Sequence, residues 1–356
     1  MKTINNLMKK GIYDGVFPGG VVLVSSKYDI IFFEAYGYAN ICTKQPMLKD
    51  TVFDLASLTK PVATTLAIIK LIQDAKLSLE QEIKYILPVF SDSSKGKIKI
   101  ENLLLHNSGL PAHKPYYRIL RNLTFINSRN ILRIFLTKES LLHPIGKEVL
   151  YSDLGFMILS WIVESISGER LDNFVKNRIY EPLCINNIFF ISTESNFDKK
   201  KEIAATEICP WRKKILQGDV HDDNAYSVGG IEGHAGIFGN AYDLHLLLSE
   251  LLSSYHGCSM KNIFKKDLIE YFFKRRIPEN RALGFDCPTF IGSSAGRYFS
   301  KETVGHLGFT GTSFWIDLKK EIIVILLTNR VHPTRLNNRI KSFRPIFHDA
   351  VMGSLL

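Results

Sequence analysis

Ser57 and Lys60, in the stretch SLTKP, are the residues whose types and spacing first indicate chemistry. Residues three apart lie on the same face of a helix with about 4.5 Å of rise between them, so the lysine amine can reach the serine hydroxyl. A serine hydroxyl is a poor nucleophile until a base removes its proton. Burial in an apolar helix and the positive end of its dipole both disfavour the ammonium form, and would lower the pKa of Lys60 into a useful range.

The helix that carries this pair is predicted to begin close to residue 57. Asp54 or Ser57 can accept hydrogen bonds from the first free amides, and Pro61 is tolerated only within the first turn. A lone S-x-x-K is nevertheless a weak signal, because a capping serine followed by an exposed lysine is common, and SKGK at 94–97 matches it in a polar loop. Aliphatic side chains follow the first pair at helical spacing, at Val62, Leu66, Ile69 and Ile72.

Two further stretches turn this pair into a pattern. YSD at 151–153 precedes an apolar helix, and HLG at 306–308 leads into a C-terminal hairpin. S-x-x-K, then Y-S-[DN], then [HK]-x-G is the signature of the serine β-lactamase and penicillin-binding protein superfamily. The chain resembles the class C β-lactamase-related serine hydrolases, which include esterases and D-amino-acid-specific peptidases. The match runs almost from end to end, through FPGGVVLVS, FDLASLTKP, IENLLLHNSGLP, YSDLGF, EPLCINN and VGHLGFTGTSFWIDL.

The resemblance implies an acyl-transfer site. Ser57 would be the acylated nucleophile, and Lys60 and Tyr151 would exchange its proton. Acyl transfer needs a nucleophile, a proton acceptor that later donates to the leaving group, and donors aimed at the developing oxyanion. Neither a metal nor an organic cofactor is required.

The resemblance also implies the rest of the site. Asp153 would contact the lysine and the substrate, and His306 would line the cleft from the strand edge. The oxyanion hole would consist of the backbone N–H groups of Ser57 and of Phe309, which follows Gly308. A small-molecule or peptide-like substrate is therefore expected.

The third motif departs from the K-T-G of many β-lactamases. In HLG the histidine is only partly charged near neutral pH, and Leu307 has no hydroxyl. Recognition of a substrate carboxylate should be weaker unless Thr310, Thr312 or Arg330 substitutes. We therefore expect a serine hydrolase acting on esters, amides or peptide-like substrates, with weak β-lactam hydrolysis at most. A true β-lactamase or D-Ala-type carboxypeptidase is the alternative, and a slowly acylating binding or sensor module is the non-enzymatic one.

Other candidate sites compete with this interpretation. GSSAG at 292–296 fits the G-x-S-x-G of α/β-hydrolases, with Asp317 and His332 following Ser294, but the flanking residues do not form the required strand and helix. The Gly-rich loop from His221 to His234 contains two histidines and two aspartates, yet its spacing fits no standard metal site. It is predicted to form a wall of the cleft. His106, in HNSGL, is interpreted as a turn residue.

The elements that must position these residues point to an α+β fold. GGVVLVSS and IIFFEAYGYA predict an N-terminal hairpin, and TSFWIDL and EIIVILLTN predict a C-terminal one. We expect these strands to form one antiparallel sheet flanked by helices, as in the β-lactamase/transpeptidase fold. The whole chain, 1–356, would be a single domain with a mostly helical subregion at about 77–240. Helices are predicted at about 57–76, 129–137, 153–167, 171–179, 241–253 and 336–354.

Composition limits the possible partners. The net charge is +10, but the basic residues form no stripe interleaved with aromatics, so a nucleic-acid partner is not expected. No apolar run is long enough to span a bilayer, and the first residues lack the apolar core of a signal peptide. The 5 cysteines are scattered without a CxxC pair, which suits reduced thiols. A cytoplasmic location is therefore expected, and the sequence does not indicate the oligomeric state.

Overall fold

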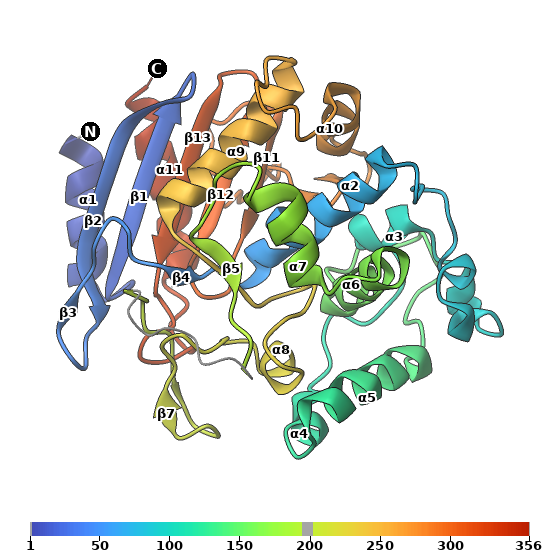
Figure 1. Cartoon of the computed structure of the whole chain (residues 1–356). Helices are drawn as coiled ribbons and strands as arrows, with labels where there is room; N and C mark the ends of the chain where they lie inside the picture. The colour runs from blue at the N-terminus through green and yellow to red at the C-terminus, as the bar shows by residue number, and fades with distance from the viewer. Residues whose placement is uncertain (1, 194–201, 356) are drawn as a thin grey trace.

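A computed structural model describes residues 2–193 and 202–355. Its main element is an 8-stranded antiparallel sheet in the order β3-β2-β1-β13-β12-β11-β10-β9 (Figure 1). The N-terminal strand β1 (Gly19–Ser26) pairs directly with the C-terminal strand β13 (Ile322–Thr328), so that Val24 faces Val324. The two predicted hairpins therefore meet at the centre of one sheet, which confirms the predicted α+β fold.

The remaining strands extend this sheet or form two small ones. In the main sheet they are β2 (Asp29–Asn40), β3 (Gln45–Pro46), β9 (Arg281–Ala282), β10 (Phe285–Asp286), β11 (Thr303–Leu307) and β12 (Ser313–Asp317). A second sheet has the order β4-β8-β5, and β6 pairs with β7. Their bounds are β4 (Phe53–Asp54), β5 (Ile188–Phe190), β6 (Ile208–Cys209), β7 (Lys214–Ile215) and β8 (Ile237–Gly239).

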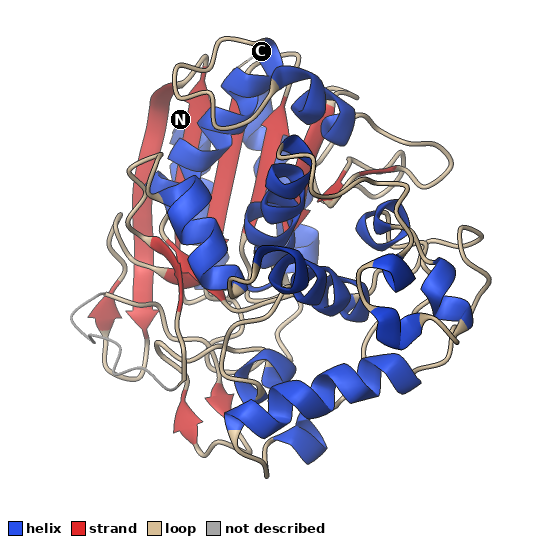
Figure 2. Ribbon diagram, turned by 45° about the vertical axis from the view of Figure 1, so that its right-hand side comes forward, coloured by secondary structure: helices blue, strands red, loops and turns tan. Residues whose placement is uncertain are grey.

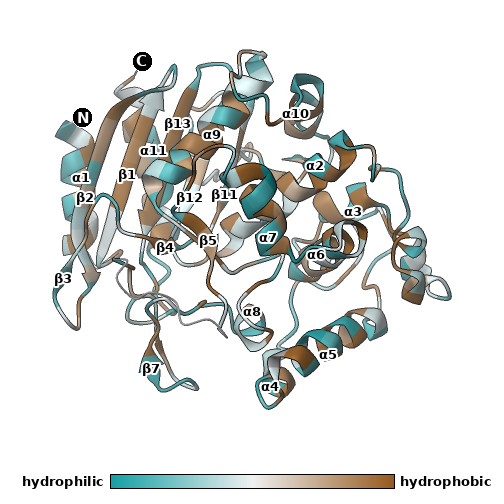
Figure 3. Ribbon diagram, viewed as in Figure 1, coloured by the Kyte–Doolittle hydropathy of each residue, from teal (hydrophilic) through white to brown (hydrophobic). Residues whose placement is uncertain are grey.

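Helices cover both faces of the main sheet (Figure 2). On one face lie α1 (Lys2–Tyr13) and α11 (Ile340–Gly353), and on the other α9 (Ala241–His256) and α2 (Leu66–Gln73) (Figure 1). Because both faces are covered, every residue of β13 is buried and its sequence, IIVILLT, is almost continuously apolar, as the brown strands of Figure 3 show. The other helices are α3 (Ile100–Leu104), α4 (Tyr117–Leu120), α5 (Phe125–Lys138), α6 (Asp153–Ser167), α7 (Leu171–Val175), α8 (Asp223–Ser227) and α10 (Lys266–Phe273).

The helix after Ser57 begins less regularly than predicted. A 3₁₀ turn (Ala56–Leu58) and a π-helical segment (Lys60–Thr65) precede α2. Of the two residues predicted to accept from the first free amides, Asp54 does so and Ser57 does not, because the Asp54 carboxylate accepts the Ala56 N–H at 2.8 Å and leaves the serine hydroxyl available. Pro61 lies at the start of the π segment, where its missing N–H costs no helical hydrogen bond.

One large apolar cluster joins the sheet to the helical region, from Val21 and Leu23 through Leu103 and Ile162 to Leu327. This continuity supports our proposal that residues 1–356 form one domain with a helical subregion at about 77–240. Within the described residues, no helix has the length and apolarity required to cross a bilayer.

Candidate active site

Ser57 and Lys60 lie together at the start of the helical segment, as the S-x-x-K spacing predicts. The Lys60 ammonium donates a hydrogen bond to Ser57 Oγ at 3.2 Å. The lysine side chain is fully buried, whereas the serine lines a cavity. The pair therefore places a hydroxyl at the surface of a cavity with its amine partner behind it.

The backbone immediately before Ser57 is strained. Ala56 has φ of +49°, a left-handed conformation that residues with a Cβ rarely adopt. Such a conformation costs on the order of 1–3 kcal/mol and persists only where the surroundings enforce it. Here the Asp54 carboxylate does so, because it accepts both the Ala56 N–H and the His221 N–H, at 2.8 and 2.7 Å. The strain turns the serine out of the helix toward the cavity.

Asp153 decides the charge of Lys60. Its carboxylate accepts from the Lys60 ammonium at 2.8 Å, and the carbonyl oxygen of His234 accepts at 3.0 Å. Burial lowers the pKa of Lys60, but the Asp153 carboxylate and Tyr151 outweigh burial, so the pKa lies above its ordinary value. The prediction of a lowered pKa is therefore wrong, because it counted burial and the helix dipole and left out the charge of the Asp153 carboxylate, although the family resemblance placed Asp153 against the lysine.

Tyr151 also contacts both the serine and the lysine. The Lys60 amine lies 4.8 Å from the centre of the Tyr151 ring, and the tyrosine hydroxyl interacts with both Ser57 and Lys60. Burial raises the pKa of Tyr151, while the Lys60 charge lowers it. The structure thus brings Ser57, Lys60, Tyr151 and Asp153 into one contiguous set.

Two histidines hold the Tyr151 ring. His106 stacks on it at a centroid distance of 4.5 Å, and its Nδ1 accepts the Ser152 N–H at 3.0 Å. The ring of His306 lies 6.0 Å from that of Tyr151, and this histidine is buried and is not among the residues that line the cavity. Burial lowers the pKa of both histidines, that of His306 to about 4, so both are neutral near pH 7. His106 was interpreted from sequence as a turn residue, and its contact with Tyr151 is visible only in the fold.

Gly308 lies where β11 ends beside the serine turn. A Cβ at this position would lie 2.0 Å from Thr312 Oγ1 and 2.7 Å from the Leu55 carbonyl oxygen. The next residue, Phe309, has 49% of its side chain exposed and lines the same cavity as Ser57. The glycine is therefore what allows the strand end to approach the nucleophile turn.

We predict that Gly308→Ala lowers kcat/KM on any ester substrate at least tenfold, because the added methyl group pushes the 308–309 backbone away from Leu55. The measurement is steady-state kinetics with p-nitrophenyl acetate. Gly146→Ala is the control, because a Cβ at Gly146 would meet no atom within 4 Å and the only cost there is its φ of +77°, whereas Gly308 has no left-handed φ. An equal loss in Gly146→Ala would show that the loss does not depend on the approach of residue 308 to Leu55.

The cavity that contains this group has a volume of about 470 Å³. Its walls come from the serine turn, the loop before α4, the loop around α8 and the end of β11. The residues that line it are Ala56, Ser57, His113, Pro115, Tyr117, Tyr151, Asp153, His221, Asp222, Asp223, His234, Ala235, Phe309 and Arg335. The Gly-rich loop, predicted to be a cleft wall, contributes four of these residues, His221, Asp222, Asp223 and His234.

Carboxylate–histidine pairs line two sides of the cavity. His113 Nδ1 lies 3.3 Å from Asp153, and His234 Nε2 lies 3.0 Å from Asp222. His221 instead lies 3.2 Å from Glu207. In the described ranges, no three His, Cys, Asp or Glu side chains are grouped as metal ligands would be. The two histidines of the loop are thus each held by a different carboxylate.

The residues proposed from sequence to replace the K-T-G side chains face away from the cavity. Thr310 and Thr312 donate to the carbonyls of Asp54 and Leu55, at 2.7 and 3.1 Å. Arg330 donates to the Phe309 carbonyl at 2.8 Å and supports the strand end. These contacts hold the oxyanion side of the site together, so none of the three groups is available for a substrate carboxylate.

Arg335 is the cation that lines the cavity instead, and sequence reasoning missed it. It forms ion pairs with Glu207 and with Asp223, the latter at 3.1 Å. Asp223 also accepts from Arg212 and from the Trp211 indole, at 2.7 and 2.9 Å. The charge of Arg335 is therefore already neutralised by two carboxylates.

The alternative triad is not assembled. Asp317 accepts from the N–H and hydroxyl of Ser300, and the ring of His332 contacts the Ile41 N–H and the Thr206 carbonyl. Ser294 contacts His348 through its backbone carbonyl, in a loop without the strand and helix of a nucleophile elbow. The α/β-hydrolase interpretation of GSSAG is wrong for this fold.

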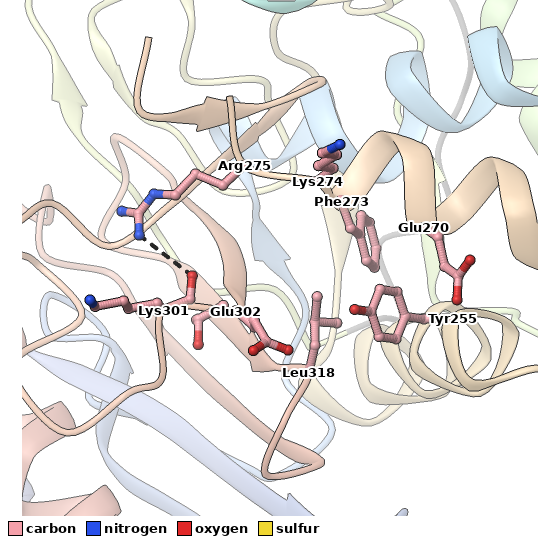
Figure 4. A pocket seen from close by; sticks show the side chains of 9 residues that line it. Tyr255, Glu270, Phe273, Lys274, Arg275, Lys301, Glu302 and Leu318 are labelled. Carbon is pink, nitrogen blue, oxygen red and sulfur yellow. Dashed lines mark hydrogen bonds between the residues drawn. The ribbon is translucent and has the colours of Figure 1, made fainter. Parts of the chain in front are cut away.

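Figure 4 shows a different cavity, of about 320 Å³, between α9, α10 and the start of β11. Its side chains include Tyr255, Glu270, Arg275 and Glu302, and Arg275 donates to the Lys301 carbonyl at 3.5 Å. It contains no serine, cysteine or histidine that could act as a nucleophile or base. The cavity at Ser57, in contrast, presents a serine hydroxyl beside a lysine amine.

Comparison with known proteins agrees with this geometry. The beta-lactamase family model matches residues 3–343. The chain is 32% identical to an N-acetylmuramyl-L-alanine amidase of Bacillus subtilis, over 93% of this chain and 81% of the relative. It is 31% identical to a Salmonella schwarzengrund protein named "Putative D-alanyl-D-alanine carboxypeptidase", over 92% of this chain and 82% of the relative.

The fold is also found in solved structures. A penicillin-binding protein homologue from Pyrococcus abyssi superimposes with a TM-score of 0.78 at 20% identity, over 99% of this chain and 77% of that one. The hydrolase EstCE1 superimposes with a TM-score of 0.74 at 23% identity, over 97% of this chain and 98% of that one. With the family model matching nearly the whole length, the chain belongs to the beta-lactamase family and is a serine hydrolase of that family.

Proposed function

We propose that Ser57 forms a covalent acyl-enzyme, with Lys60 and Tyr151 moving its proton. The observation that carries the proposal is the 3.2 Å contact between Lys60 Nζ and Ser57 Oγ at the wall of a 470 Å³ cavity. In the described part of the chain, the N–H groups of Ser57 and Phe309 donate to no other group, which supports their assignment as the oxyanion hole.

The proton path follows from the charges. In the resting state Lys60 is an ammonium paired with Asp153, so the reactive form is the one in which the Lys60–Tyr151 pair has lost one proton. That pair takes the Ser57 proton as Oγ bonds to the substrate carbonyl carbon, and returns it to the leaving nitrogen or oxygen as the carbonyl–leaving-group bond breaks. A water molecule then gives a proton to the same pair and attacks the acyl carbon, and Ser57 regains its proton as it leaves.

For the substrate, we propose an amide of the muramyl-peptide class. The Bacillus relative named as an N-acetylmuramyl-L-alanine amidase matches over 93% of this chain. The cavity wall supports this choice, because Oδ2 of Asp222 can accept hydrogen bonds from sugar hydroxyls, and Tyr117 and Phe309 offer flat aromatic surfaces along the same wall. A lactyl-amide carbonyl at Ser57 would place the sugar against these groups.

A D-Ala-type carboxypeptidase is the second candidate, because a relative carries that name. That reaction requires recognition of a free terminal carboxylate. Thr310, Thr312 and Arg330 are engaged with backbone carbonyls, and Arg335 is paired with Glu207 and Asp223. The lack of an uncompensated cation along the cavity described here favours the amidase.

The test is a substrate panel on purified protein. We expect release of L-alanine-led peptide from N-acetylmuramyl-L-alanyl-D-isoglutamine and hydrolysis of p-nitrophenyl butyrate. Penicillin G and diacetyl-Lys-D-Ala-D-Ala should turn over at least about 100-fold more slowly. Faster release of D-alanine than cleavage of the muramyl amide would reverse the order of the two candidates, and efficient penicillin turnover without ester cleavage would overturn both.

Tyr151→Phe should lower kcat about 10²–10⁴-fold on the preferred substrate, because it removes one half of the proton-transfer pair while the ring still packs against His106 and His306. The effect should be larger on amides than on p-nitrophenyl esters, since p-nitrophenolate leaves without a proton and an amine does not. Steady-state kinetics on both substrates measures the difference. Equal losses on both would place Tyr151 outside the leaving-group step.

We also propose a reducing, cytoplasmic location. All five cysteines are free, including the exposed Cys42, Cys184 and Cys258. Exposed free thiols are common in reducing compartments and rare in secreted proteins. Fractionation of cells that express the full chain, with thiol alkylation of each fraction, tests the location.

A further inference from the structure

The segment from α4 to the start of α5 presents basic and aliphatic side chains to solvent. Ile119, Leu123 and Ile126 are exposed by 56%, 38% and 74%. Arg118 and Arg121 are exposed between and beside them. We call these five residues the basic–apolar rim. In Figure 1 they belong to the elements at the bottom of the molecule, and in Figure 3 α4 and α5 carry both brown and teal segments.

The segment that contains the rim has basic residues and no acidic ones. From residue 114 to residue 138 the sequence contains Lys114, Arg118, Arg121, Arg129, Arg133 and Lys138 and no aspartate or glutamate. Glu164 pairs with Arg129 and Arg133, and Glu139 pairs with Lys114. Within the described residues, Arg118 and Arg121 take part in no ion pair. The rim therefore keeps two uncompensated positive charges beside its apolar side chains.

The rim is connected to the active site through Tyr117 and Trp211. Tyr117 opens α4, lines the cavity and stacks on Trp211 at 5.8 Å, and its N–H donates to the Asn224 side chain at 2.8 Å. The Arg121 guanidinium lies 5.5 Å from the centre of the Trp211 ring. The rim thus begins one residue after a cavity-lining side chain and is braced against the β6–β7 hairpin.

We propose that the basic–apolar rim docks the protein on an anionic lipid bilayer, with the mouth of the Ser57 cavity at the membrane surface. Aliphatic side chains enter the boundary between headgroups and acyl chains, and arginines pair with anionic headgroups. Three exposed aliphatic residues grouped with uncompensated arginines, and an acid-free run around them, match both requirements. A second copy of this chain is a poorer occupant, because the rim offers it no acidic residue with which to pair its own arginines.

The test is co-sedimentation of the full chain with vesicles. We expect binding to phosphatidylglycerol/phosphatidylcholine vesicles at 50 mM salt, weaker binding at 500 mM salt, and no binding to pure phosphatidylcholine. Arg118→Glu with Arg121→Glu should lower the vesicle partition coefficient at least tenfold. Ile119→Ser with Ile126→Ser should lower it several-fold while keeping its dependence on salt.

Lys27→Glu with Lys319→Glu is the matched control. It changes the net charge by the same amount, in the β1–β2 and β12–β13 turns, which lie at the opposite end of the sheet from α4 in Figure 1. Its partition coefficient should stay within twofold of the wild type. Hydrolysis of p-nitrophenyl butyrate by every variant verifies folding, since neither the rim nor the control residues line the cavity.

Three results would overturn the proposal. The first is absence of binding to anionic vesicles. The second is an equal loss of vesicle partitioning in the control variant, which would mean that only net charge matters. The third is equally tight binding to a soluble polyanion such as heparin. A concentration-dependent dimer abolished by Ile119→Ser with Ile126→Ser would assign the rim to a second copy instead. Docking is independent of the reaction at Ser57, so vesicle binding and substrate turnover can fail separately.

Discussion

Ser57→Ala is expected to abolish covalent labelling by a fluorophosphonate and to lower kcat on p-nitrophenyl butyrate by at least about 10⁴-fold. Alanine cannot form the acyl-enzyme, and the remaining oxyanion donors and binding contacts retain only a small part of the rate enhancement. Stability should change little, because the hydroxyl contacts Lys60 and Tyr151 at the edge of a cavity rather than inside the packed core. Intact-protein mass spectrometry after exposure to the probe is the measurement.

Ser294→Ala is the matched control for this experiment. Ser294 lies in the sequence motif that most resembles another serine hydrolase, and its side chain has no histidine base in the structure. The variant should label and turn over like the wild type. Labelling that persists in Ser57→Ala and disappears in Ser294→Ala would refute the proposed nucleophile.

Asp153→Asn is expected to move the alkaline rise of kcat/KM to lower pH by at least about one unit. The Asp153 carboxylate stabilises the Lys60 ammonium at 2.8 Å, so its neutralisation lowers the pKa of Lys60 and makes the deprotonated Lys60–Tyr151 pair more abundant. Ester hydrolysis from pH 6 to pH 10.5 measures the change. Asp153→Glu keeps the charge and should leave the position of the rise close to that of the wild type.

The same substitution should destabilise the protein at neutral pH. Removing one partner of a buried ion pair costs about 3–5 kcal/mol, and the lower end applies here because 18% of the Asp153 side chain is exposed. The pKa of Asp153 is lowered by Lys60 despite burial, so its contribution to stability is present above its unfolded pKa of about 4 and is lost at lower pH. The pKa of Lys60 is raised, so its contribution is present below its unfolded pKa of about 10.4 and is lost above it.

Urea unfolding of the wild type and of Asp153→Asn at pH 3, 7 and 10.5 would test this window. The difference in unfolding free energy should be largest at pH 7. A constant difference across the three pH values would mean that packing rather than charge accounts for the loss. An unchanged pH–rate profile together with reduced stability would show that Asp153 supports the fold without setting the charge of Lys60.

Local pattern was enough to predict most of the elements. The alternation and length of GGVVLVSS and EIIVILLTN predict strands, and the start of α6 at Asp153 follows from Ser152, whose hydroxyl accepts the Gly155 N–H at 3.2 Å. Boundaries were less accurate at α11, predicted from about 336 and observed from Ile340. Residues 336–339 instead form a polar turn in which Asn337 donates to the carbonyls of Gly15 and Val16, a partner segment more than 300 residues away.

The sequence by itself determined the α+β class, the pairing of the terminal hairpins and the residues that could perform acyl transfer, because spacing within a turn or a strand is a local property. The tertiary structure alone decided the charge of Lys60, the support of Tyr151 by His106, the inward orientation of Thr310, Thr312 and Arg330, and the entry of Arg335 into the cavity. Each of these depends on contacts between segments distant in sequence, and electrostatic energies change with ångström distances and burial that spacing along the chain does not specify. Ser57, its lysine and the approach of Asp153 could therefore be predicted from the sequence, whereas the 2.8 Å distance at which the carboxylate keeps the lysine charged became known only from the fold.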